Sequence, residues 1–147
     1  MTDPVPMPPP DPEAYPYRAQ VQMRWKDNDI YGHVNNAEYY SYFDTVINEV
    51  LIERGGLDIA RGDVIGLCAE SHCKYLGPLD YPGTVDAYMR VGHLGNSSVR
   101  YELALFEFGE CSAVGWFVHV FVDRESGRPV EITGQMRQLL ESLRVAE

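Results

Sequence analysis

Polar side chains that can take part in acyl transfer are concentrated in residues 27–39, which read Asp-Asn-Asp-Ile-Tyr-Gly-His-Val-Asn-Asn-Ala-Glu-Tyr. The two aspartates lie a few residues before a predicted helix start. The first turn of a helix carries unpaired backbone N–H groups and the positive end of the helix dipole, which together can hold a developing oxyanion. A carboxylate close to those N–H groups supplies a base or a nucleophile. The segment therefore predicts half of an acyl-transfer site.

A long helix is predicted directly after the two asparagines. Apolar residues recur at steps of three and four over residues 39–51, which is the period of an amphipathic helix. Asn35 is placed to cap the first turn, and Glu38 is placed to complete a capping box. Arg54-Gly55-Gly56 supplies a cationic last turn and a glycine that can end the helix.

Strands are predicted over most of the remaining chain. Several segments alternate between polar and apolar residues, and one segment is almost continuously apolar, as expected for a strand covered on both faces. Short turns join consecutive strands, which favours antiparallel pairing. The predicted strands are residues 18–26, 64–76, 85–91, 99–105 and 113–122. With a short C-terminal helix that Thr133 is placed to cap, this order predicts an α+β architecture.

The motif Asp-x-Asp-x-x-Gly-His-Val-Asn-Asn-x-x-Tyr at residues 27–39 resembles the signature of hotdog-fold acyl-CoA thioesterases of the 4-hydroxybenzoyl-CoA thioesterase class. Residues 74–79, Lys-Tyr-Leu-Gly-Pro-Leu, resemble the Tyr-x-x-Pro-Leu element of that family, and residues 118–129 resemble its closing strand and turn. The resemblance implies a hotdog domain over residues 17–147, in which an antiparallel sheet wraps around one central helix. The proline-rich residues 1–16 are expected to form a flexible tail.

The resemblance also implies roles for individual residues. It places the catalytic carboxylate, acting as general base or nucleophile, on Asp29, and the oxyanion donor on the backbone N–H of Asn36 or of a neighbouring residue. His33 and Asn35 match further polar positions of the motif and are expected to line the pocket. A thioester has a reactive carbonyl and a good leaving group, so no metal and no cofactor are expected. The residues assigned to substrate binding are Tyr31, Gly32, Tyr39, Ser97 and Ser98.

Ordinary structural interpretations compete with these roles. Asp29 can be a turn residue, His33 a core histidine and Asn35 simply a helix cap. Asp27 is expected to be a strand-end charge rather than a second catalytic acid. Glu49, on the predicted helix, is an alternative base, because some hotdog enzymes place theirs on that helix.

Composition limits the classes of partner. Acidic residues outnumber basic ones by 22 to 12, so the net charge of −10 argues against a nucleic-acid or anionic-membrane surface. No apolar run reaches the roughly 20 residues needed to span a bilayer. The 3 cysteines form no Cys-x-x-Cys pair, which indicates reduced thiols in a cytoplasmic protein. A lone hotdog sheet leaves open edges, so a homodimer or homotetramer is expected.

The predicted activity is hydrolysis of an acyl-CoA thioester to a carboxylic acid and free CoA. A non-catalytic acyl-CoA-binding module and a hydratase or dehydratase on the same fold are the alternatives. Residues 93–98, His-Leu-Gly-Asn-Ser-Ser, lack the Arg and Lys with which some family members bind the CoA phosphates. Acyl-carrier protein therefore remains a second class of acyl donor, although this acidic chain shows no obvious basic patch for it.

Overall fold

The first strand of the sheet is β1 (Tyr17–Gln22), which alternates between exposed and partly buried residues as predicted. The computed structural model describes residues 6–145. The prediction of a strand through Lys26 is wrong at its end, because the chain turns into a short 3-10 helix, η2 (Trp25–Asp27). The side chain of Asp27 draws the backbone into this turn by accepting the N–H of Arg24 at 2.9 Å. Trp25, expected on the buried face, is 74% exposed as a result.

The predicted long helix is α1 (Asn36–Gly55). The side chain of Asn35 caps it by accepting the N–H of the second helical residue at 3.0 Å, and Gly56 ends it with a left-handed φ of 75°. The predicted capping box is not formed, because Glu38 makes an ion pair with Arg24 instead, at 3.5 Å between Oε2 and Nη2. The helix buries a stripe at three- and four-residue spacing: Tyr39, Tyr42, Phe43, Val46, Ile47, Val50, Leu51 and Gly55.

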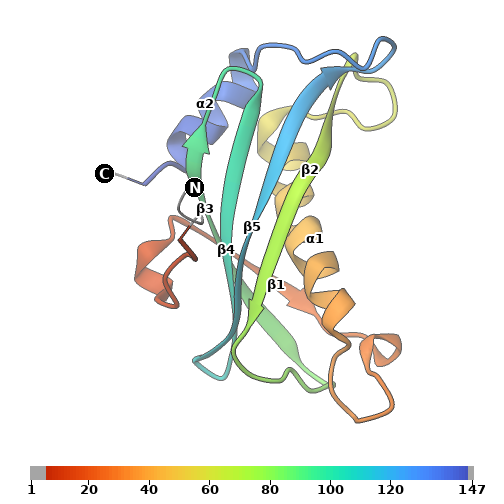
Figure 1. The fold of residues 1–147 in the computed structure, drawn as a ribbon, viewed down its shortest axis with the longest axis vertical. Helices are drawn as coiled ribbons and strands as arrows, with labels where there is room; N and C mark the ends of the chain where they lie inside the picture. The colour runs from red at the N-terminus through yellow and green to blue at the C-terminus, as the bar shows by residue number, and fades with distance from the viewer. Residues whose placement is uncertain (1–5, 146–147) are drawn as a thin grey trace, which may run out of the picture.

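Four further strands complete an antiparallel sheet in the order β1-β3-β4-β5-β2. They are β2 (Val64–Tyr75), β3 (Thr84–Leu94), β4 (Ser98–Glu107) and β5 (Glu110–Asp123). Although β2 and β3 are consecutive, they do not pair. Instead β2 pairs with β5, so the connection after β2 crosses the end of the sheet. The sheet curves around α1 (Figure 1), which confirms the predicted α+β hotdog fold.

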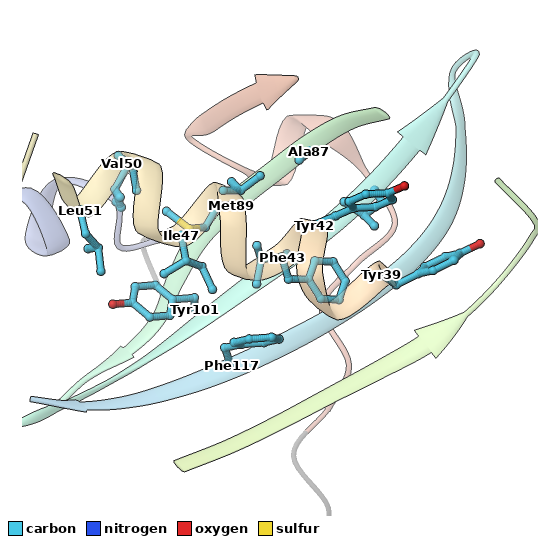
Figure 2. Packing of buried hydrophobic residues seen from close by; sticks show 14 of the residues in the cluster. Tyr39, Tyr42, Phe43, Ile47, Val50, Leu51, Ala87, Met89, Tyr101 and Phe117 are labelled. Carbon is cyan, nitrogen blue, oxygen red and sulfur yellow. The ribbon is translucent and has the colours of Figure 1, made fainter. Parts of the chain in front are cut away.

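The core lies between α1 and the concave face of the sheet. Figure 2 shows Phe43 and Ile47 of the helix projecting toward Tyr101 of β4 and Phe117 of β5. The rings of Phe43 and Phe117 meet edge to face, with centroids 6.0 Å apart. Close contact between helix and sheet is possible here because β5 carries Gly115, which has no side chain to hold the Phe43 ring away. This contact packs the first half of α1 closely against β5.

The opposite face of the sheet is covered in part by the N-terminal segment. A turn at Pro12–Ala14 (η1) leads to Tyr15, which is buried against Phe106 and Val114, and Met7 packs against the same cluster. The described part of the expected tail thus contacts the sheet, and its flexibility stays a prediction. Residues 1–5 of the expected tail lie outside the described residues.

The predicted C-terminal helix is α2 (Gly134–Ser142), which packs its leucines near the end of α1. Thr133 occupies the capping position, but its side chain makes no capping hydrogen bond, so that detail of the prediction is wrong. Among residues 6–145, neither helix is both long and apolar enough to cross a membrane.

Replacing Gly115 with alanine tests the contact between helix and sheet. The added Cβ would collide with the carbonyl oxygen of His72 and come within 2.7 Å of the Phe43 ring. We expect Gly115→Ala to lower the free energy of unfolding by about 1–3 kcal/mol in urea titrations. Gly77→Ala is the control, because its Cβ meets no atom within 4 Å. Equal unfolding midpoints for the two variants would contradict this account of the packing.

Candidate functional site

A cleft of about 440 Å³ opens between the start of α1 and the end of β2. Its walls come from the turn before α1, from the first turn of α1 and from the chain that leaves β2. The motif residues that line it are Asp29, Tyr31, His33, Val34, Asn36 and Tyr39. The residues that line it from the side of β2 are Tyr75, Leu76, Gly77 and Pro78. The fold thus joins the two sequence elements that carry the family resemblance at one cleft.

Asp29 is half-buried, and its carboxylate is held by the turn that it begins. Its Oδ1 accepts the backbone N–H of Tyr31 at 2.8 Å and that of His33 at 3.4 Å. Within the described part of the chain, its Oδ2 has no hydrogen-bond partner. Asp29 is therefore a turn residue. The same bonds hold its carboxylate at the wall of the cleft with one oxygen free.

Asn36, the first residue of α1, brings an unpaired donor to the cleft. Its backbone N–H has no acceptor among residues 6–145. The neighbouring N–H groups are occupied: that of Asn35 donates to the Asp27 carbonyl at 2.8 Å, and that of Ala37 donates to the Asn35 side chain at 3.0 Å. Asn35 itself caps the helix and does not line the cleft. The N–H of Asn36 is thus available to a ligand.

His33 lines the cleft with its side chain 52% exposed, so the interpretation as a core histidine is wrong. Its Nδ1 forms a 2.6 Å hydrogen bond with Oδ1 of Asp80, on the segment that follows β2. An exposed pair of this kind adds little to stability. Its effect is to fix the orientation of the imidazole ring, which leaves Nε2 as the ring nitrogen without a partner among the described residues.

Asp27 is fully buried, which corrects the expectation of a strand-end charge. Its Oδ2 accepts the hydroxyl of Tyr42 at 2.7 Å, and its Oδ1 lies 3.0 Å from Nη2 of Arg24. Burial raises the pKa of this carboxyl, but the hydrogen bonds from Tyr42 and Arg24 outweigh burial, so the net pKa lies below the ordinary value. Asp27 does not line the cleft, and its contacts make it an anchor between η2 and α1.

Gly32 and Tyr31, both predicted to bind substrate, belong to the turn before α1. Gly32 has a φ of 82°, which favours glycine, and it does not line the cleft. Tyr31 lines the cleft with an exposed ring. Of the two turn residues that were predicted to bind substrate, Tyr31 therefore lines the cleft and Gly32 does not.

Ser97 and Ser98 lie at the other end of the sheet. Ser98 pairs with Val120 of β5, which is level with Leu67 of β2, whereas the cleft begins at Tyr75. The eight residue steps along β2 between these levels span roughly 26 Å at about 3.3 Å per residue. Within one chain the two serines therefore do not reach the cleft, and their substrate-binding role stays a prediction.

Glu49, the alternative base, is also remote from the cleft. It is exposed on α1, 13 positions after Asn36, which corresponds to roughly 20 Å along a helix. Its charge acts on Tyr17 of β1, where it helps to raise the pKa of the phenol, a shift due mainly to burial. The geometry within one chain favours Asp29 over Glu49.

A cation does approach the turn that contains Ser97 and Ser98, although residues 93–98 supply none. Arg137 of α2 donates through Nη2 to the carbonyl of Gly95 at 2.6 Å and through Nε to the carbonyl of Ile132 at 2.7 Å. These bonds occupy the guanidinium of Arg137 and hold the turn against α2.

A second cavity, of about 230 Å³, lies at the C-terminal end of α1. Three acidic residues line it, namely Asp58, Asp63 and Glu131, and none of the motif residues does. In the described chain, no group of three or more His, Cys, Asp or Glu side chains is placed to hold a metal ion. The cleft beside Asp29 is the candidate functional site, because the Asn36 N–H and the Asp29 carboxylate both lie at this cleft.

Sequence reasoning missed the wall that β2 contributes. Tyr75 and Gly77 belong to the element that resembles Tyr-x-x-Pro-Leu, so the signal was present, but periodicity alone does not place that element opposite the helix start. Asp80 follows that element directly and carried no spacing signal of its own. Tyr42 was missed as a partner for Asp27 because the aspartate was expected to be exposed.

Comparison with known proteins agrees with the fold and the motif. The model of the thioesterase-like superfamily matches residues 23–140. The PA5185 protein from Pseudomonas aeruginosa strain PAO1 is 52% identical, with a TM-score of 0.91 over 95% of this chain and 99% of that one. A thioesterase from Thermus thermophilus, solved with coenzyme A and Zn, is 30% identical, with a TM-score of 0.75 over 89% of this chain and 96% of that one.

A curated relative, the uncharacterized protein YsmA of Bacillus subtilis, is 24% identical over 86% of each chain. The match of the family model covers most of this chain, and the chain belongs to the thioesterase-like superfamily. This membership supports thioesterase activity in general.

The anchoring role of Asp27 predicts a pH-dependent loss of stability. Since the folded-state pKa is lowered, the carboxylate stabilises the fold above its unfolded pKa of about 3.9, and this contribution is lost as the pH falls. We expect Asp27→Asn to lower the free energy of unfolding by about 2 kcal/mol at pH 7, with a smaller difference from wild type at pH 3.5. Tyr42→Phe should show the same trend with a smaller amplitude. Urea titrations at both pH values measure this, and a difference independent of pH would contradict it.

Proposed function

We propose that this chain hydrolyses an acyl-CoA thioester, with Asp29 as general base or nucleophile and the backbone N–H of Asn36 as oxyanion donor. The observation that carries the proposal is that one cleft contains a carboxylate oxygen and a helix N-terminal N–H, neither of which has a hydrogen-bond partner among residues 6–145. These are the two groups that thioester hydrolysis needs from the protein. Membership of the thioesterase-like superfamily supports the same reaction class.

The chemistry follows from these two groups. As a general base, Asp29 removes a proton from water while the water oxygen forms a bond to the thioester carbon. The carbonyl oxygen then carries negative charge, which the Asn36 N–H and the positive end of the α1 dipole stabilise. The C–S bond breaks as the carbonyl re-forms, and CoA leaves as a thiolate. As a nucleophile, Asp29 would attack the carbon directly, the C–S bond would break with loss of CoA as a thiolate, and water would hydrolyse the resulting anhydride.

CoA is the favoured acyl carrier. The Thermus thermophilus thioesterase that is 30% identical was solved with coenzyme A, which supports a CoA ligand here. Tyr31 and Tyr39 line the cleft and would contact the acyl group or the pantetheine arm. His33, oriented by Asp80, would place its free Nε2 toward the same ligand.

We further propose that the working unit is a homodimer, or a homotetramer built from dimers. Within the described part of the chain, β2 pairs only with β5, and it exposes most of its 12 residues along an open edge. Antiparallel pairing of two β2 strands about a twofold axis would bring the far end of one sheet toward the cleft of the other. The partner subunit's Ser97 and the partner's Ser98 would then lie near the substrate, which reconciles their predicted role with their position.

Replacing the proposed base tests the activity. We expect Asp29→Asn to lower kcat/KM by at least about 100-fold, because the amide cannot accept the proton from water. The measurement is thiol release, followed with a thiol reagent, from acyl-CoAs with short, aromatic and long acyl groups. Glu49→Gln is the matched control, since the remote helix carboxylate should be dispensable.

Three outcomes would contradict the proposal in different ways. Equal thiol release by wild type and Asp29→Asn would exclude Asp29 as the base. Loss of activity in Glu49→Gln alone would transfer the role to the helix. Absence of thiol release by wild type across the whole panel, with acyl-CoA still bound, would favour the non-catalytic binding module.

The oligomeric state tests the proposed assembly. We expect light scattering after size-exclusion chromatography at micromolar concentration to give twice 16.7 kDa, about 33 kDa, or four times that monomer mass. A mass of 16.7 kDa would contradict both the dimer and the placement of the two serines near the substrate.

A further inference from the structure

The segment that leaves β2 is fastened to the helix start by four hydrogen bonds in succession. The hydroxyl of Tyr75 donates to the carbonyl of Asn36 at 3.0 Å, and that of Tyr39 donates to the carbonyl of Gly77 at 3.3 Å. Further along, the N–H of Val34 donates to the Leu79 carbonyl at 2.8 Å, and His33 bonds to Asp80 at 2.6 Å. Residues 75–80 therefore run alongside residues 33–39 and close one side of the cleft.

The two tyrosines make a reciprocal pair of contacts within this arrangement. Tyr75 belongs to β2 and binds the backbone of α1, whereas Tyr39 belongs to α1 and binds the backbone after β2. Their rings meet edge to face, with centroids 5.0 Å apart at 74°. Figure 2 shows Tyr39 extending from the first turn of α1 toward the segment that follows β2.

Both hydroxyls remain donors at any pH at which the protein would work. Burial raises the pKa of Tyr39 to about 12, and burial likewise raises the pKa of Tyr75 to about 12. A phenol in this state donates its proton to a carbonyl and carries no charge that would repel Asp29. The pair is therefore suited to holding backbone in place rather than to transferring protons.

The backbone that the pair holds is the part of α1 that the reaction uses. Asn36 and Tyr39 are three residues apart and lie on one face of the first helical turn. The carbonyl held by Tyr75 belongs to Asn36, the residue whose N–H is unpaired at the cleft among the described residues. Asp29 is held independently by its own turn. The distance between carboxylate and N–H thus depends on how firmly the first turn of α1 is fixed.

We propose that Tyr39 and Tyr75 are positioning residues that clamp the first turn of α1 against the segment after β2, so that the Asn36 N–H is aimed at the developing oxyanion. This inference rests on the proposed thioesterase function and deepens it. Neither tyrosine is assigned a role in forming or breaking bonds. The two contacts act together on the same turn of α1, so that the loss of either hydroxyl is enough to loosen that turn.

Tyr39→Phe, Tyr75→Phe and the double variant test the clamp, since each change removes a hydroxyl and keeps the ring. We expect each single variant to lower kcat about tenfold while KM changes less than about twofold, because substrate binding is retained while alignment is lost. The double variant should have nearly the same kcat as the slower single variant, because the two contacts act as a unit. Tyr88→Phe is the matched control: Tyr88 is a half-buried residue of β3, and its hydroxyl makes no hydrogen bond among the described residues.

A second measurement is independent of activity. The Val34 N–H lies next to the clamp along the same two segments and is bound to the Leu79 carbonyl. We expect its hydrogen-exchange protection to fall about tenfold in the double variant, with unchanged protection in β4 and β5, because only this segment opens locally. Unchanged protection at Val34 would overturn the clamp even if the wild type had no thioesterase activity.

Loss of protection with wild-type kcat would overturn the positioning role and leave a structural contact. A rise in KM with unchanged kcat would also overturn it, since the two hydroxyls would then serve substrate binding and not the alignment of the helix start. If wild type releases no thiol from any acyl-CoA, the proposed function fails, and the exchange measurement still decides whether the clamp exists.

Discussion

The geometry of this molecule depends on the hydrogen bonds and the ion pair that the buried Asp27 carboxylate makes. An ionised side chain with no solvent contact is costly to bury unless donors surround it. Here the donors are the Tyr42 hydroxyl and the backbone and guanidinium of Arg24. The main chain of the same residue accepts the N–H of Asn35, which caps α1. Asp27 thus connects the segment after β1 to the buried face of α1, through Tyr42, and to the beginning of α1, through Asn35.

The turn that contains Asp29 is held between these fixed points. Its carboxylate satisfies the turn with one oxygen and leaves the other at the cleft. The structural and catalytic interpretations of Asp29 are therefore compatible, because the bonds that make it a turn residue also orient it. The same holds for the helix start, where capping by Asn35 occupies its neighbours and leaves the Asn36 N–H unpaired within the described chain.

Local patterns were sufficient to predict the elements, and long-range contacts account for most of what was missed. The three- and four-residue spacing of apolar residues predicted α1 and its ends, and the alternation of polar and apolar residues predicted the strands. Both periods arise because one face of each element is buried. The predicted end of the first strand was wrong, because the hydrogen bonds of Asp27 form a turn where the alternation of polar and apolar residues predicted a strand. Predicting the wall formed by Tyr75 and Gly77 required knowing that β2 pairs with β5, and no residue in β2 encodes that pairing locally.

The proline-rich segment before β1 also restricts how copies of this molecule can pack. Met7, Ala14 and Tyr15 shelter one half of the outer sheet face over Ala104, Phe106 and Val114. Prolines lack the N–H needed to extend a ladder, so the segment shields the sheet without adding a strand. A neighbour that stacked sheet upon sheet over this half would meet the segment before it met the strands. A copy that approached along the β2 edge, as in the proposed dimer, would avoid that obstacle, so this segment is compatible with self-association that lengthens the sheet.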